Sequence, residues 1–138
     1  MIEAFSQVNW VGVLAASIAQ FVLGGIWFVG VVAKHYPVSL GIADRPQEKP
    51  GTLFLVGPFL CIALTIATTA ILLRAFSITT YGEALALGGL VGVGYLLPMT
   101  LNIAINPLFP RPFYYTALNA PYFVGGSVMA SAILVALT

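Results

Sequence analysis

Charged residues are scarce in this chain: only 7% of its 138 residues are Asp, Glu, Lys or Arg, while 60% are hydrophobic. Soluble domains carry about 25% charged residues, so the composition indicates a membrane protein. The few charges leave long uncharged runs at residues 4–33, 50–73, 84–110 and 112–138.

Each uncharged run is longer than the roughly 20 residues that a helix needs to cross about 30 Å of hydrocarbon. Runs such as "LAASIAQFVLGGIWFVGVV" are apolar on every face and lack the alternation of a barrel strand. The first run is too long for a cleavable signal peptide, and no basic residue precedes it. We therefore predict an all-α integral membrane bundle, a single domain over 1–138, with short loops and transmembrane helices near 8–33, 53–74, 84–106 and 118–138.

Cysteine and histidine occur once each, as Cys61 and His35. One residue of each kind cannot supply a conventional multi-ligand metal or haem site, and a single cysteine forms no internal disulfide. We therefore expect neither a metal nor any other cofactor.

Acidic residues are absent from the interior of the predicted spans, since Glu83 stands at the start of the third. The proton exchange of small multidrug transporters relies on a membrane-embedded glutamate, which is missing here. The serines within the spans have no intramembrane base to activate them. The mixed charges of the 34–51 loop nearly cancel, which argues against nucleic-acid binding. We expect a protein that is not an enzyme and binds no nucleic acid.

Basic residues are distributed unevenly between the two ends of the predicted bundle. The loops on one side hold Lys34, Arg45, Lys49 and Arg111, and the other side holds only Arg74. By the positive-inside rule the two loops lie in the cytoplasm and both termini lie outside. The bias is small, which leaves dual insertion open as an alternative.

Small residues recur at helical spacing in three of the predicted spans. In lipid, helices associate through close backbone approach and interhelical hydrogen bonds, so we interpret these positions as packing faces rather than as a ligand groove. The helix-packing residues are Gly12, Ala16, Gly88, Gly92, Gly126 and Ala130.

Polar residues inside the spans define a candidate polar site made of Gln20, Pro98, Asn102 and Asn106. Pro98 cannot bond to the carbonyl of Gly94 and should kink the third span, and the two asparagines are one helical turn apart. The residues form either a structural hydrogen-bond cluster or a substrate site. We expect Asn106 to bond the adjoining turn and leave Asn102 open between the two.

The segment "INPLFPRPFYYTALNAPYF", residues 105–123, combines prolines and aromatic rings between two apolar runs. Its first prolines should end the third span, and Asn119 should cap the fourth, with Pro121 in its first turn. The aromatic rings match a belt at headgroup level, where Arg111 would reach a lipid phosphate, a helix end or a neighbouring amide.

Four motifs also carry a resemblance: "NW" at 9–10, "LGGIWF" at 23–28, "LGGLVGVG" at 87–94 and "INPLFPRPFYYTALNAPY" at 105–122. In order and spacing they resemble the bacterial membrane family catalogued as domain of unknown function 1761, an uncharacterised family. The resemblance implies a four-span layout and a bacterial inner membrane. It gives family positions to Asn9, Trp10, Gly24, Trp27, Asn106, Phe109, Arg111, Asn119 and Tyr122. Arg111 comes one residue early, and Phe28 replaces a tyrosine of the family pattern.

Three functions remain compatible with these features. The first is assembly within the membrane, as a homo-oligomer or a subunit of a membrane complex surrounded by membrane lipids. The second is a small transporter, channel or lipid-binding module that uses Pro98, Asn102 and Gln20. The third is a membrane enzyme that acts on a lipid headgroup near Arg111 and Tyr114.

The basic bias predicts the topology directly. A reporter fused after Thr138 should be active on the outer side, and one inserted near Gln47 on the cytoplasmic side. A Gln47 reporter found wholly outside would overturn the assignment, and one found on both sides would indicate dual insertion.

Overall fold

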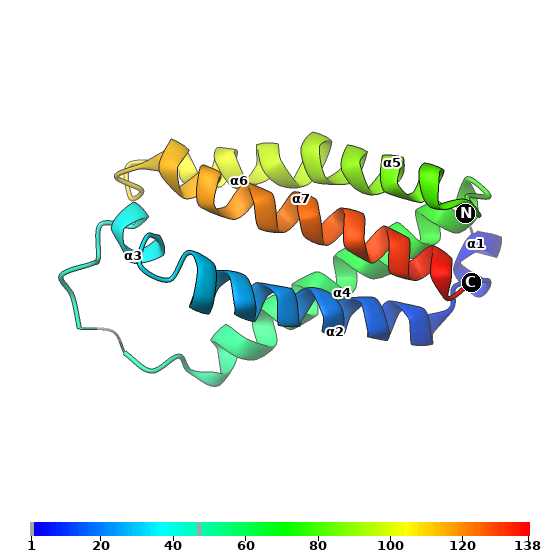
Figure 1. Ribbon diagram of the computed structural model, residues 1–138, viewed down its shortest axis with the longest axis horizontal. Helices are drawn as coiled ribbons and strands as arrows, with labels where there is room; N and C mark the ends of the chain where they lie inside the picture. Colours follow the sequence, from blue (N-terminus) through cyan, green and yellow to red (C-terminus); the bar gives the residue numbers. More distant parts are fainter. Residues whose placement is uncertain (1, 47) are drawn as a thin grey trace.

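The computed structural model describes residues 2–46 and 48–138, so that Gln47, the loop position named for the reporter, lies outside the described residues. The described part of the chain is helical and contains no strand, which confirms the predicted all-α class (Figure 1). In chain order the elements are α1 (Ile2–Ser6), α2 (Trp10–Gly25), η1 (Ile26–Val31), α3 (Tyr36–Ser39), α4 (Thr52–Ala75), α5 (Tyr81–Val91), η2 (Gly92–Leu96), α6 (Leu97–Ala104) and α7 (Pro112–Ala136).

Four helical stretches are long and apolar enough to cross a membrane, as predicted. They cover Trp10–Val31, Thr52–Ala75, Tyr81–Ala104 and Pro112–Ala136. The last one begins at Pro112 rather than near 118, and Asn119 is therefore not its cap. Pro112 takes the first position of the helix, where its missing N–H costs nothing, so Pro121 lies in the helix interior instead of the first turn.

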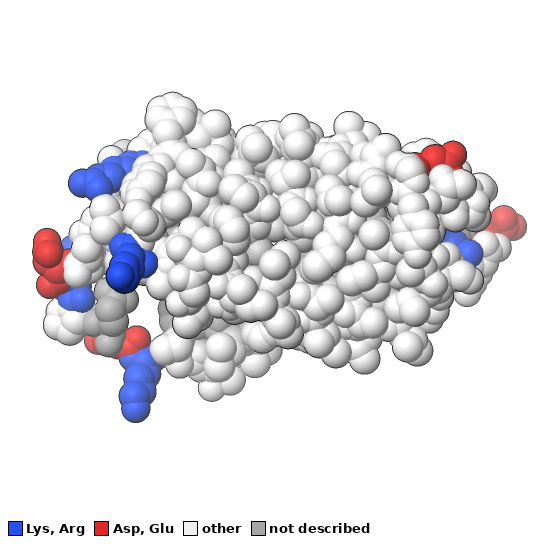
Figure 2. Space-filling view, viewed as in Figure 1, with Lys and Arg blue, Asp and Glu red and all other residues white. Residues whose placement is uncertain are grey.

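The spans alternate in direction, which places both termini at one end of the bundle (Figure 1). The 34–51 loop and the 105–111 turn lie at the opposite end, where they meet: a Cβ built on Gly41 would approach Cγ of Pro110 to 2.9 Å. Gly41 also has a φ of +68°, a conformation that favours glycine. Charged side chains gather at the two ends and leave an uncharged band between them (Figure 2).

Helix α7 is the centre of the bundle, with 44% of its most apolar window buried compared with 22–28% for the other spans. Helix α5 approaches it most closely at two glycines. A Cβ on Gly88 would lie 2.8 Å from the carbonyl oxygen of Ser127, and a Cβ on Gly92 would lie 2.9 Å from the Cα of Val124. These two glycines therefore serve packing within the bundle.

Two π-helical segments, η1 in the first span and η2 in the third, interrupt spans that were predicted as continuous helices. In η1 the N–H of Val32 donates to the carbonyl of Trp27, and in η2 the N–H of Leu97 donates to the carbonyl of Gly92, so each bond spans five residues. The second segment ends just before Pro98. A local π-bond pattern redistributes the backbone bonds next to a proline that has no N–H to offer.

The close approach at Gly88 generates a prediction about stability. Gly88→Ala should destabilise the fold by about 1–3 kcal/mol, because the added methyl overlaps the α7 backbone. Gly89→Ala is the matched control, since nothing lies within 4 Å of its Cβ position, and it should be neutral or slightly stabilising. Unfolding in mild detergent, followed by circular dichroism, measures both; equal stability of the two variants would contradict the packing.

Candidate functional site along helix α7

The family-like residues are concentrated where α2 and η1 meet α7. At the terminal end, Asn9 caps α2: its Oδ1 accepts from the N–H of Val11 at 3.1 Å and of Gly12 at 3.3 Å. Its Nδ2 also donates to the carbonyl of Leu137 at 2.6 Å. One side chain thus satisfies the start of α2 and fastens it to the end of α7, while the neighbouring Trp10 packs edge-on against Phe5.

Midway along the bundle, Tyr122 and Gln20 join the same two helices. The hydroxyl of Tyr122 donates to the backbone carbonyl of Gln20 at 3.3 Å. A Cβ on Gly24 would lie 3.0 Å from that hydroxyl, so a glycine is what lets the ring enter. The Gln20 side chain, only 4% exposed, lies over Gly126, whose added Cβ would come within 2.8 Å of Nε2. Gln20 is therefore a packing residue between two helices.

Towards the loop end, Trp27 and Asn119 bond to backbone carbonyls of α7. The indole N–H of Trp27 donates to the carbonyl of Leu118 at 2.8 Å, close to the interior proline Pro121. Asn119 is 2% exposed, and its Nδ2 donates to the carbonyl of Tyr115 at 2.7 Å. Both bonds add a side-chain donor to a carbonyl near Pro121, but neither reaches the carbonyl of Ala117, which Pro121 leaves without its helical donor.

A chain of aromatic rings leads from Tyr122 to the loop end. Phe28 lies 5.1 Å from Tyr122 and 5.3 Å from Tyr36, and Tyr115 lies 5.8 Å from Tyr36 and 4.9 Å from Phe109, measured between ring centroids. Three of these contacts are edge-on, a favourable arrangement of aromatic rings. Phe28 contributes a ring face and needs no hydroxyl for these contacts.

At the end of this ring chain, His35 and Tyr36 lie against α7. The Nδ1 of His35 is 2.6 Å from the hydroxyl of Tyr114, which ties the loop to the helix. Burial, and next the hydrogen bond with the Tyr115 hydroxyl, raise the pKa of Tyr36 well above its ordinary value of 10.0. Tyr36 is therefore neutral at physiological pH and offers no phenolate nucleophile.

The predicted polar site is not assembled in the structure. Gln20 is buried against α7, whereas Pro98, Asn102 and Asn106 are exposed. In α6 the buried residues are Thr100 and Ala104, and Asn102 lies two residues from each, which points it away from α7 at 100° per residue.

The two asparagines also differ from each other. Asn106 bonds its own turn, donating to the carbonyl of Ile103 at 3.1 Å and accepting from the N–H of Leu108 at 2.7 Å. Asn102 has no hydrogen-bond partner among the described residues and fits neither of the two roles considered for it.

The interior of the bundle contains many hydroxyls, and most of them bond to their own helix. Ser17 donates to the carbonyl of Val13, Thr69 to Thr65, Thr100 to Leu96, Thr116 to Pro112 and Ser131 to Ser127. Ser127 Oγ is buried without a partner in the part of the chain described. The backbone carbonyl of Ser127 is in tight contact with α5 at Gly88. Side chains bonded in this way close the interior rather than line a polar path.

Two cavities bear on ligand binding. One, at the terminal end beside Asn9 and Arg74, has about 10 Å³, the space of a single water. The other is an open groove of about 350 Å³ on the outside, between α4 and α5 with η2, lined by Leu64, Thr65, Thr68, Thr69, Leu72, Val91, Tyr95 and Leu96. None of the predicted polar-site residues lines either cavity. Within the described residues no three His, Cys, Asp or Glu side chains are grouped to hold a metal ion.

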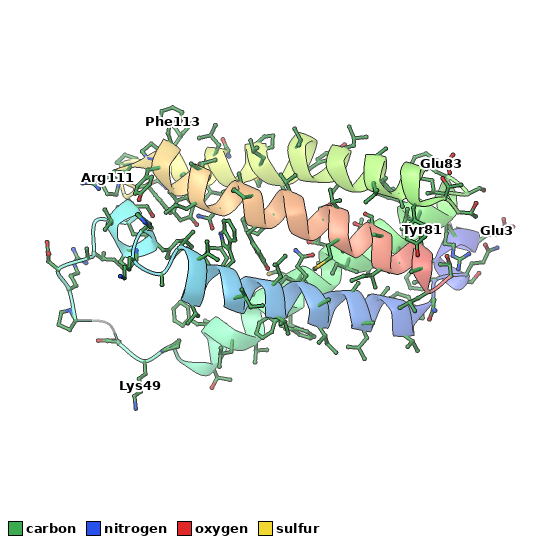
Figure 3. The ribbon with its side chains drawn as sticks, viewed as in Figure 1. Glu3, Lys49, Tyr81, Glu83, Arg111 and Phe113 are labelled. Atoms are coloured by element: carbon green, nitrogen blue, oxygen red, sulfur yellow. The ribbon has the colours of Figure 1, made fainter. Side chains whose placement is uncertain are left out.

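Exposed aromatic side chains lie at both ends of the bundle. Arg111 precedes the first turn of α7 and points away from the bundle, with Phe113 beside it, while Tyr81 and Glu83 lie at the opposite end (Figure 3). The exposed rings of Phe113 and Tyr81 thus lie near opposite ends of the uncharged band, as in the aromatic belts of membrane proteins.

Sequence reasoning missed the ring chain and the His35–Tyr114 bond. The His35–Tyr114 bond and the Phe28–Tyr122 contact each join residues about 80 or more positions apart. The other ring contacts join separate elements, so no local spacing in the sequence reveals them. The available signal was composition: aromatic residues are dense at both 27–36 and 109–123.

The fold defines an all-helical bundle with four helices long and apolar enough to cross a membrane, fastened around α7 by the family-like residues. The family model described as "Protein of unknown function (DUF1761)" matches residues 11–135. The chain therefore belongs to this family, which confirms the resemblance carried by its motifs. No curated protein and no solved structure matches the chain.

The buried tyrosine of the loop end predicts an alkaline transition. The unfolded chain releases the Tyr36 proton near pH 10.0 while the folded protein keeps it, so this contribution to stability is full below pH 10 and is lost as pH rises above it. The parent should lose stability between pH 9 and 11 as its unfolded form ionises. Tyr36→Phe cannot ionise, so its free energy of unfolding should fall by about 1 kcal/mol less over this range. Unfolding in detergent at several pH values across this range measures the free energy of unfolding. Tyr81→Phe, at an exposed tyrosine, is the control. If stability falls equally with pH in Tyr36→Phe and in the parent, the burial of Tyr36 is contradicted.

Proposed function

We propose that this protein acts by assembly within a bacterial inner membrane, as a homo-oligomer or a subunit of a membrane complex, and that it is not an enzyme. The observation that carries this proposal is how the interior is filled. Most of its hydroxyls bond to their own helices, and the cavity beside Asn9 has only about 10 Å³. Such an interior leaves the outer surface as the place where a partner can act.

The outer surface supports the proposal further, because one of the four spans is much less covered by its neighbours than the others. Helices α2, α5 and α6 pack on α7, whereas the first half of α4 is almost uncovered: Leu53, Phe54, Leu55 and Val56 are consecutive exposed apolar residues. Burial of such a segment by another polypeptide would allow close helix contact, which drives association in lipid.

The charge distribution supports an orientation with both termini outside. Arg111 and Lys49 lie at the loop end, and Glu3 and Glu83 lie at the terminal end (Figure 3). Anionic lipid at the cytoplasmic surface would attract the basic end.

A second candidate function is a lipid-binding or transport module. The outside groove of about 350 Å³ favours it, because its volume falls within the range of small-molecule sites. This candidate no longer rests on Pro98, Asn102 and Gln20, since those residues lie elsewhere.

The test of the proposal is a native mass spectrum of the full chain, extracted in mild detergent. Assembly predicts a homo-oligomer or a complex with a co-purified protein. A monomer that carries only stoichiometric phospholipid would contradict assembly and support the lipid-binding candidate.

A further inference from the structure

The first half of α4 stands apart from its own bundle. Its residues Thr52–Cys61, here called the α4 arm, include no buried side chain, and the first buried one along the helix is Ile62. Leu53 is 76% exposed. Only Gly57 and Phe59 are partly covered, and Phe59 packs edge-on against Phe21 of α2. Figure 1 shows the arm diverging from α6 and α7 towards the loop end.

A recess follows the arm along the second half of α4. The groove of about 350 Å³ lies between the second half of α4 and the α5–η2 segment. One of its lining residues, Tyr95, lies four and seven residues before Met99 and Asn102, which places these exposed residues on one stripe of the third span. Each copy of the chain thus offers a protruding apolar arm and, at the same depth, an exposed stripe that begins at the edge of the recess.

Two polar groups on this stripe lack partners among the described residues. Tyr95 is 72% exposed, and its position is about 4 Å along the axis from the midpoint of the span Tyr81–Ala104. Asn102 is exposed on the same stripe. Acyl chains offer neither donors nor acceptors, and unpaired polar groups are costly in hydrocarbon. The stripe therefore calls for a polypeptide rather than a lipid chain.

The arm offers a matching acceptor. Pro58 lies inside α4 and lacks the N–H that would bond to the carbonyl of Phe54. Phe54 is the third residue of its span, and Asn102 is the third from the end of its own. Because both of these ends lie at the loop end of the bundle, the two groups lie at a similar depth.

We propose that two copies of this chain pair about a two-fold axis along the membrane normal, each laying its α4 arm against the Tyr95–Met99–Asn102 stripe of the other, which lies at the same depth. The amide of Asn102 donates to the Phe54 carbonyl of the partner copy, and the symmetry repeats the bond. The two α4 helices cross where each leaves its own bundle, at Cys61. This inference rests on the proposed function of assembly and names its surface and its partner.

Cross-linking through the native cysteine tests the arrangement in membranes. Cys61 is exposed, so oxidation with copper phenanthroline should give a reducible dimer that Cys61→Ser abolishes. The control combines Cys61→Ser with Ile18→Cys, which moves the thiol to an exposed position in the middle of α2; it should give no dimer. Absence of a Cys61 dimer, or an equal yield from the control, would overturn the pairing.

Association of fluorescently labelled copies in phospholipid vesicles tests the hydrogen bonds. By symmetry the dimer contains two of these bonds, and Asn102→Leu removes both donors. If each bond has the average strength of an intramembrane hydrogen bond, losing both should raise the dissociation constant of the dimer about sevenfold. Pro58→Ala restores the helical N–H for the Phe54 carbonyl and should also weaken pairing. Ile103→Leu, at an exposed neighbouring position, should leave it unchanged. Since these residues are exposed, circular dichroism should show an intact fold in each variant.

The outcomes separate the two proposals. An oligomer or complex in the native mass spectrum, without Cys61 cross-linking and without an effect of Asn102→Leu, would overturn the arm exchange while assembly stands. A monomer by every measurement would overturn both.

Discussion

The close approach of α5 to α7 is the contact on which the rest of the bundle depends. Lipid tails are as apolar as the helices, so the bundle is held by backbone proximity and hydrogen bonds rather than by exclusion from water. Gly88 and Gly92 bring α5 to the α7 backbone itself. Gly126 and Gly24 do the same for α2 by admitting Gln20 and Tyr122. Two spans are thereby attached to the central helix α7, and α4 is the span that such contacts leave largely free.

The sequence predicts the membrane class and the number of spans because both follow from simple quantities. Uncharged run length and the cost of a charge in hydrocarbon determine where a helix can cross. Boundaries were less predictable. Both Pro112 and Asn119 are acceptable near a helix start, and the structure uses Pro112, where the missing N–H costs nothing, and keeps Pro121 inside the helix.

The candidate polar site was not predictable for a different reason. The spacing of Asn102 and Asn106 places them on one face, but it does not say which face meets α7. The small and buried residues of α6, Thr100 and Ala104, determine that, and they lie opposite Asn102. The π-helical segment η2 also shifts the phase between α5 and α6, so a helical stripe drawn through the whole span points in the wrong direction.

The family-like residues gain a common interpretation from their positions. Asn9, Gly24, Trp27 and Tyr122 contact or bond the backbone between the first span and α7, Asn119 bonds within α7, and none of them lines the groove. Residues that serve the joint between two helices specify an architecture. The proposed function of assembly depends on the surface that this architecture leaves exposed. The α4 arm, with its apolar side chains and its interior proline, is the part of that surface least explained by the needs of a single copy.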